Sequence, residues 1–416
     1  MERIIVKNFG GITELDIELK PINIFIGKQA SGKSVTVKLV YFFKSVFASL
    51  FRTATDNLDI TEWVKELESI FRKYFPEYAW QGLNFTIEYF WDAGSMRISH
   101  RNRLSIEVSD SLQVLFRVAQ NLTQNAKNID YPTLPNEVLP EISVYRRFVR
   151  MIQSEIGEYA GRSILFVPAG RSFFAQLDDS IYSLIDETRN TLEVFTREFG
   201  RFYAGLKPFV LEKQNDEEWY RQAVQQASAL LAADYFRQDK QDFLRHSDNR
   251  VVEIAHAASG QQELLPLLLV LRSLERVKGN GGGMTLIFEE PEAHIFPSTQ
   301  RDLVNLMGLF FNKSHQAVQY FITTHSPYIL TSFNNLLYAG VLAADERVNK
   351  EEVYKIVPQE QILQRGTVAA FEMSGGTAKS IMDEETGMIF AEYLDQVSEE
   401  TAVQFDNLLD LMPYHE

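Results

Sequence analysis

The chain has 416 residues, of which 45% are hydrophobic and 12% aromatic, and this composition is that of a globular protein rather than a disordered one. The absence of cysteine excludes a disulfide framework, an iron–sulfur cluster and any zinc site built on cysteine. With 56 acidic and 41 basic side chains the formal net charge is −15, so nucleic-acid phosphates should repel the chain unless its basic residues are segregated.

The N-terminal region shows neither an export signal nor a membrane span. Met1–Ile5 leads directly into a strand pattern, without the charged and then apolar segment of a secretory leader. The most apolar stretch, 35–51, is interrupted by Lys38 and Lys44, so we do not expect it to cross a bilayer. These observations predict a cytoplasmic protein with no membrane partner.

The first segment with chemical information follows a short apolar strand pattern at 22–26. Residues 27–34 read G-K-Q-A-S-G-K-S, which matches the phosphate-loop (Walker A) pattern G-x-x-x-x-G-K-[ST], and a helical pattern follows. The loop amides and the helix N-terminus would hold phosphates, Lys33 would reach the β- and γ-phosphates, and the Ser34 hydroxyl would bind Mg²⁺. The alternative is a chance match in a strand-to-helix turn. The predicted nucleotide-binding residues are Gly27, Lys28, Gln29, Ala30, Ser31, Gly32, Lys33 and Ser34.

Three short segments further along the chain, 85–89, 95–99 and 104–108, read as antiparallel strands of a small β-subdomain. Basic side chains cluster nearby and on a later predicted helix, where they are either solvated surface or phosphate contacts. These basic residues are Arg97, His100, Arg101, Arg103, Arg146, Arg147 and Arg150.

A second helix start with possible anion affinity occurs at 257–263, which reads A-A-S-G-Q-Q-E and precedes an apolar helical segment at 264–274. Locally, Ser259 is predicted as the N-cap, and Gln262 three residues later would complete a capping box. A capped helix N-terminus also suits an anion, so the structural and functional interpretations are compatible.

Two carboxylates end the apolar strand pattern that begins at Met284. In a nucleotide hydrolase, the first acid of this Walker B pattern binds Mg²⁺ and the second polarises the attacking water. Glu289 is therefore predicted to support Mg²⁺ and Glu290 to position water. Glu289 stands where aspartate is commoner, and its extra methylene would move the metal contact by about an ångström. The alternative is a pair of surface acids after a core strand.

A single histidine, His325, ends the next strand pattern at 318–324, and Ser326 with Pro327 is predicted to open a helix as N-cap and first residue. A lone histidine at a strand end is often structural. Ligands of open α/β sheets, however, collect at the carboxyl ends of the strands, where the phosphate loop and the Walker B acids must also lie. His325 is therefore predicted to sense the γ-phosphate.

In this order the four elements resemble the Walker A, signature, Walker B and switch-histidine motifs of ABC-type ATPases, in the group related to SMC and recombination-mediator proteins rather than transporter subunits. Residues 289–297, E-E-P-E-A-H-I-F-P, are similar to the E-E-P-E-x-H-L-x-P segment of the OLD (overcoming lysogenization defect) ATPases and their stand-alone relatives in bacterial antiphage systems. Residues 322–327, I-T-T-H-S-P, share this similarity, and residues 166–172, F-V-P-A-G-R-S, resemble the P-A-x-R-S segment of the Q-loop region.

The resemblance implies ATP and Mg²⁺ as ligands and a homodimer that encloses two nucleotides head to tail. Ser259, Gly260 and Gln261 of one protomer would then face the γ-phosphate held by the other. It also implies that Arg171 contacts the nucleotide, with a structural salt bridge as the alternative. Phe296 departs from the pattern, because transporter enzymes carry a D-loop aspartate at that position.

OLD nucleases carry a C-terminal TOPRIM domain, for which too few residues remain after Leu342. We therefore expect a switch for a separate effector, such as a nuclease, in antiphage defence. The alternatives are a repair or chromosome-maintenance ATPase that binds DNA directly and a scaffold that holds ATP without hydrolysing it.

Strand patterns that alternate with helical patterns predict an α/β fold of the ABC-type P-loop class, with a mostly parallel core sheet, a small antiparallel β-subdomain and helical insertions. A phosphate-loop mimic at 374–380, S-G-G-T-A-K-S, is predicted to be a plain loop. The expected units are a discontinuous nucleotide-binding core at 1–50, 160–180 and 250–345, a β-subdomain with a helical insertion at 51–160, a helical insertion at 181–249, and a C-terminal helical segment at 346–416.

Overall fold

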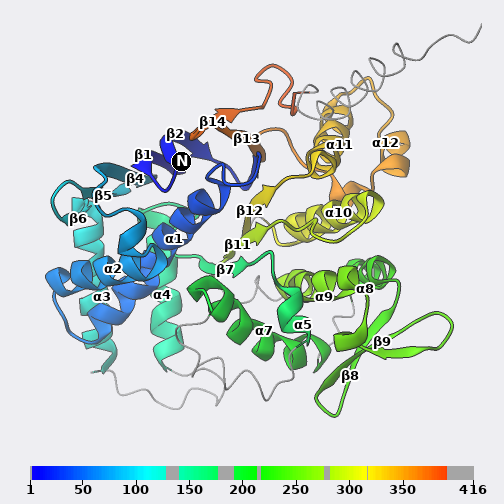
Figure 1. The fold of residues 1–416 in the computed structure, drawn as a ribbon, viewed down its shortest axis with the longest axis horizontal. Coiled ribbons are helices and arrows are strands. Elements are labelled where there is room, and N and C mark those ends of the chain that lie inside the picture. Colours follow the sequence, from blue (N-terminus) through cyan, green and yellow to red (C-terminus); the bar gives the residue numbers. More distant parts are fainter. Residues whose placement is uncertain are drawn as a thin grey trace, which may run out of the picture.

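The computed structural model describes residues 2–127, 140–176, 192–212, 217–275, 282–315 and 317–390. Within these residues the strands form one mixed 11-stranded sheet and a separate 3-stranded sheet. Helices cover both faces of the large sheet (Figure 1).

One half of the large sheet is parallel and carries the segments that the sequence singles out. Every residue of its strand at 318–324 is buried, as expected for a central parallel strand that helices cover on both faces. The predicted α/β fold with a mostly parallel core sheet is therefore confirmed. In their order across the sheet, these strands are β13 (Val368–Ser374), β3 (Ile22–Ile26), β12 (Val318–Thr324), β11 (Met284–Glu289) and β7 (Ser163–Val167).

The other half of the sheet is antiparallel and includes the three strands predicted between 85 and 108. Continuing outward, its strands are β2 (Ile12–Leu19), β1 (Glu2–Phe9), β4 (Phe85–Trp91), β5 (Gly94–His100) and β6 (Leu104–Val108). Strand β14 (Thr377–Ser380) joins the two halves, because it pairs antiparallel with β13 while its Thr377 pairs in parallel with Glu14 of β2. The predicted antiparallel strands are thus confirmed, and they extend the main sheet through the pairing of β4 with β1.

Two hydrophobic clusters lie on opposite faces of the sheet. Alternate strand residues enter opposite clusters: Ile287 and Phe321 pack in one, Phe288 and Ile322 in the other. The helices of the first cluster are α1 (Lys33–Thr55), α2 (Ile60–Tyr74), α3 (Asp110–Lys127) and α4 (Pro140–Glu155). Those of the second are α5 (Ser172–Gln176), α7 (Val194–Glu212), α8 (Glu218–Leu231), α9 (Ser259–Ser273), α10 (Pro297–Lys313) and α11 (Pro327–Ala344).

The prediction of a helical segment at 346–416 is wrong for the residues that the structure describes. After the short helix α12 (Lys350–Ile356), the chain enters the large sheet as β13, beside β3, and returns as β14. The mimic at 374–380 is accordingly a β-hairpin and not a loop, since Gly375 and Gly376 adopt φ values of 57° and 78° and form its two-residue turn. Residues 383–390 are not helical either, and 391–416 lie outside the described residues.

The segment 181–249 is only partly the helical insertion that the sequence suggests. Helices α7 and α8 agree with it, but the chain then forms the small antiparallel sheet of β8 (Asp234–Gln238), β9 (Gln241–Arg245) and β10 (Val251–Glu253). Asp239 and Lys240 make the β8–β9 turn at positive φ, and this turn lacks the glycine that normally signals a hairpin. Residues 181–191 and 213–216 lie outside the described part of the chain.

Among the described residues one helix, α1, has the length and composition of a membrane span. Of its most apolar window, 67% is buried inside the molecule, where it packs against the sheet. Lys44, which interrupts the apolar stretch in the sequence, forms an ion pair with Glu2 inside the protein.

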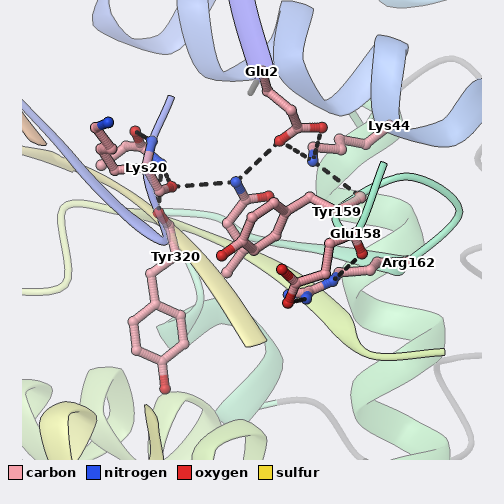
Figure 2. A network of polar contacts seen from close by, with 9 residues as sticks. Glu2, Lys20, Lys44, Glu158, Tyr159, Arg162 and Tyr320 are labelled. Carbon is pink, nitrogen blue, oxygen red and sulfur yellow. Dashed lines mark hydrogen bonds and ion pairs between the residues drawn. The ribbon is translucent and has the colours of Figure 1, made fainter. Parts of the chain in front are cut away.

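A buried polar network connects α1 to the sheet (Figure 2). Lys44 Nζ lies 2.6 Å from both carboxylate oxygens of Glu2, and both side chains are almost fully buried. Gln319 donates to the same carboxylate at 3.1 Å, and Lys44 also donates to the Tyr159 carbonyl at 3.1 Å. Burial lowers the pKa of Lys44 to about 8, while the negative charge of Glu2 acts in the opposite direction. The side chains of Glu2, Lys44 and Gln319 therefore hold β1, α1 and β12 together.

We expect Lys44→Met to destabilise the protein by about 3–5 kcal/mol, because it leaves the Glu2 carboxylate buried without a counter-charge. The double variant Glu2→Gln/Lys44→Met should lose clearly less stability than the single variant, since no charge remains buried. Chemical denaturation would measure both differences. A single variant no less stable than the double variant would contradict this account of the network.

Candidate functional site

The phosphate loop (residues 27–34), the Walker B acids and His325 meet at one edge of the parallel half-sheet. Strand register brings them there, because Ile26 pairs with Thr324, and Thr323 pairs with Glu289. The Glu290 amide donates to the Thr323 carbonyl at 2.9 Å and extends this alignment past the strand end. Three segments that are far apart in the chain therefore share one site.

The phosphate loop is shaped for an anion. Gly27 packs so closely against β13 that an added Cβ would lie 2.2 Å from the Met373 carbonyl oxygen, so no larger residue fits there. Helix α1 begins at Lys33 after Gly32, which has a φ of 97°, and no side chain caps its N-terminus. The first amides of α1 therefore remain available to phosphate oxygens.

Lys33 is folded over its own loop. Its Nζ donates to the carbonyls of Gly27 at 2.6 Å and Lys28 at 2.9 Å. Burial lowers the pKa of Lys33, and the charges of Glu290 and Glu292 oppose this shift. The ammonium group is thus held against the loop, and the nearby carboxylates oppose the effect of burial.

The two groups predicted to hold Mg²⁺ lie near each other. Glu289 is the last residue of β11, and Ser34 is in the first turn of α1. Burial raises the pKa of Glu289, and the nearby Ser34 hydroxyl and the charge of Lys38 act against that shift. A hydroxyl and a carboxylate side by side suit Mg²⁺, which takes few protein ligands and completes its shell with phosphates and water. No group of three or more His, Asp or Glu side chains suited to a metal occurs among the described residues.

Glu290 and His325 form a pair at the open edge of the site. His325 Nε2 lies 3.2 Å from Glu290 Oε1, and both side chains are partly exposed, at 36% and 42%. The helix start after His325 is as predicted, with Ser326 as N-cap, its hydroxyl accepting from the Tyr328 amide, and Pro327 as the first residue of α11. The pair could contact a reacting group that enters from solvent.

A third acid of the same segment, Glu292, has a role that the sequence did not reveal. Its Oε1 accepts hydrogen bonds from Thr324 Oγ1 at 2.7 Å and from the His325 amide at 2.8 Å. Burial raises the pKa of Glu292, and these two bonds act against the shift. Glu292 therefore fixes the backbone of His325 to the acidic loop (residues 289–294). The spacing of three acids in E-E-P-E is the one sequence signal that could have suggested such a role.

The helix that carries the signature segment, α9, begins one residue earlier than predicted. Ala258 is the N-cap of α9, not Ser259, and the Ala258 amide donates to Gln261 Oε1 at 3.3 Å. Gln262 instead donates to the Ile254 and Ala255 carbonyls, so the predicted capping box is wrong. The cause is the helical backbone of Ser259, which places its side chain on the first turn, exposed and unused as a cap.

Ser259, Gly260 and Gln261 do not join the site of their own chain. In the described residues no hydrogen bond connects them to the phosphate loop, whereas a Cβ on Gly260 would lie 2.9 Å from the His294 carbonyl oxygen. The N-terminus of α9 thus packs against the acidic loop. Lys28, Gln29 and Ala30 are exposed at the tip of the phosphate loop, and Ser31 is partly exposed.

The structure supports the structural alternative for Arg171 and not the predicted nucleotide contact. Its side chain is fully buried, and its guanidinium donates to backbone carbonyls of the acidic loop and of α9. Its nearest carboxylate is that of Glu263, 3.5 Å from Nε. A phosphate could reach this guanidinium only after these contacts were broken.

A phosphate loop, two acids after a neighbouring strand and a histidine at the same sheet edge define the class of ABC-type P-loop ATPases. Residues 54–330 match the AAA ATPase domain family, and the chain belongs to this family. It is an ATPase, which binds and hydrolyses ATP. No curated protein sequence matches the chain.

Several solved structures are similar in outline. An SMC head bound to the C-terminal winged-helix domain of ScpA aligns with a TM-score of 0.42 at 11% identity, over 91% of this chain and 96% of that chain. The SMC head of Thermotoga maritima aligns with a TM-score of 0.37 at 11% identity, over 92% and 98%. An ATP-binding cassette of an ABC transporter in its ADP conformation aligns with a TM-score of 0.32 at 11% identity, over 97% and 98%.

Proposed function

We propose that this ATPase is a switch in which ATP joins two copies of the chain head to tail, and in which the dimer controls a separate effector. The observation that carries the proposal is the position of Ser259. It lies exposed in the first turn of α9, where the N-cap residue Ala258 provides no side-chain cap, and the neighbouring Gly260 packs against the acidic loop rather than the phosphate loop of its own chain. A helix end of this kind binds anions, and a second copy would bring one to it.

In this arrangement each nucleotide lies between the phosphate loop of one protomer and Ser259, Gly260 and Gln261 of the other. Glu290 positions the attacking water, and His325, held against Glu290, senses the γ-phosphate. Ser34 and Glu289 would hold Mg²⁺, which neutralises charge on the phosphates when bound. Because this chemistry depends on positioning and charge, hydrolysis without a partner should be slow and switch-like.

The similarity of 289–297 and 322–327 to the OLD ATPases and their stand-alone relatives supports antiphage defence as the biological role. The effector would be a separate protein such as a nuclease, and the switch would act in the cytoplasm. In this proposal the effector supplies the second activity, and the ATPase controls when it acts.

Direct DNA binding in repair or chromosome maintenance is the second candidate function. A pocket of about 390 Å³ on the antiparallel half-sheet favours it, since Lys7, Arg97, His100 and Arg101 line this pocket. Glu107 also lines it, and Arg97 lies 3.6 Å from Glu88, so part of the positive charge is neutralised. We therefore prefer the effector switch.

We expect Glu290→Gln to bind ATP, to hydrolyse it at least about a hundredfold more slowly, and to accumulate as an ATP-bound dimer, because the amide cannot orient water as a carboxylate does. Phosphate release and light scattering after gel filtration would measure these effects. The exposed acid Glu346 gives the matched control Glu346→Gln, which should behave like the parental protein. Lys33→Ala should fail to bind nucleotide. Hydrolysis by Glu290→Gln at the parental rate would show that Glu290 does not have this role.

The effector proposal predicts that the chain alone does not protect cells from phage. Co-expression with a nuclease encoded by a neighbouring gene should reduce plaque numbers, and Lys33→Ala should abolish that protection, because the switch needs ATP. Plaque assays with each protein alone are the control. Equal protection by the ATPase alone, together with ATP-dependent and salt-sensitive gel shifts of duplex DNA, would favour direct DNA binding instead.

A further inference from the structure

The backbone of the acidic loop is strained at the residue proposed to position water. Glu290 adopts a left-handed conformation with φ of 44°, and His294 at the other end of the loop has φ of 60°. Residues with a Cβ rarely adopt this region, and such conformations persist only where the surrounding structure enforces them. The loop needs a restraint, and the proposed role of Glu290 depends on that restraint.

Arg171 supplies the restraint on one side. Its Nη1 and Nη2 both donate to the Glu290 carbonyl, at 3.3 and 3.4 Å. Nη1 also donates to the Glu289 carbonyl at 3.2 Å, and Nη2 to the Pro291 carbonyl at 3.1 Å. Three consecutive carbonyls around the strained residue are therefore held by one guanidinium.

The same side chain also holds the helix of the signature segment. Its Nε donates to the Glu263 carbonyl in α9 at 2.9 Å, and Nη1 donates to Pro168 in its own turn at 3.3 Å. The Glu263 carboxylate is buried at 3.5 Å from Nε and provides the counter-charge. The planar fork of arginine can serve all these acceptors at once, whereas a lysine ammonium is a single point with three donors.

From this geometry we propose that Arg171 is a positioning residue of the ATPase, which holds Glu290 in its left-handed conformation and attaches the acidic loop to the N-terminal part of α9. The inference rests on the proposed function. It adds a physical connection between the acidic loop and the signature segment of one protomer. In a head-to-tail dimer, Glu290 and Ser259 of one protomer serve different nucleotides, and Arg171 joins the segments that carry them.

The matched pair of variants is Arg171→Lys and Arg162→Lys, because both arginines are buried and they flank the same strand, β7. Arg162 lies over the Tyr159 ring at 4.2 Å and contacts Glu158, away from the acidic loop. Hydrogen exchange followed by mass spectrometry would compare peptides that cover 289–295 and 259–263. Turnover and ATP affinity would be measured on the same folded samples.

We expect Arg171→Lys to speed exchange in both peptides by about tenfold or more, since the hydrogen bond from the Ala293 amide to the Glu290 carbonyl loses its support. Its kcat should fall by about tenfold to a hundredfold, with ATP affinity changed less than about threefold, because a displaced Glu290 affects turnover and not the phosphate loop. Arg162→Lys should lower thermal stability without either effect.

Unchanged exchange at 289–295 in folded Arg171→Lys would overturn the inference. A parental protein that hydrolyses no ATP would refute the proposed function instead, while the exchange comparison would still decide the role of Arg171. If Arg171→Lys does not fold, Glu263→Gln provides the second test, because it removes the counter-charge and keeps every carbonyl acceptor. It should speed exchange in both peptides by a smaller factor, and parental exchange in this variant would overturn the inference.

Discussion

The parallel pairing of β3, β12 and β11 is the constraint on which the site depends. Parallel strands end at the same edge of a sheet, so the loop that follows each one must lie beside the next. The pairing of Ile26 with Thr324 and of Thr323 with Glu289 thereby aligns the phosphate loop, His325 and the acidic loop. Because β12 is buried on both faces, a one-residue slip in its register would move its side chains into the wrong hydrophobic cluster as well as separate the three segments.

The site is rich in acidic side chains, whereas a simple pocket for an anion would be lined by basic ones. Three acids, Glu289, Glu290 and Glu292, gather near Lys33, and burial raises the pKa values of the first and the third. ATP would bring further negative charge to this edge. A divalent cation beside Ser34 and Glu289 would offset it, which gives a physical reason for Mg²⁺. The overall charge of −15 therefore says little about this site, where a few groups decide the local field.

Local patterns predicted the parts of the site that are contiguous in the chain, whereas parts made by distant contacts were missed or misread. The phosphate loop, the strand before Glu289 and the helix start at Ser326 each have a signal within ten residues. Arg171 is different, because its carbonyl partners at Glu290 and Pro291 lie more than 100 residues away and carry no side-chain pattern. Strand β13 was missed because burial of both its faces removes the alternation that marks a strand.

The central claim is that each nucleotide is shared between two protomers, and mixing two inactive variants tests it most directly. Lys33→Ala removes the phosphate-loop half of a site, and Ser259→Arg removes the signature half. In a mixed dimer, the phosphate loop of the second variant meets the signature segment of the first, so one intact site forms. The account predicts that the mixture regains ATP hydrolysis that neither variant has alone. Hydrolysis by the mixture equal to the sum of the two separate variants, over a range of protein concentrations, would contradict it.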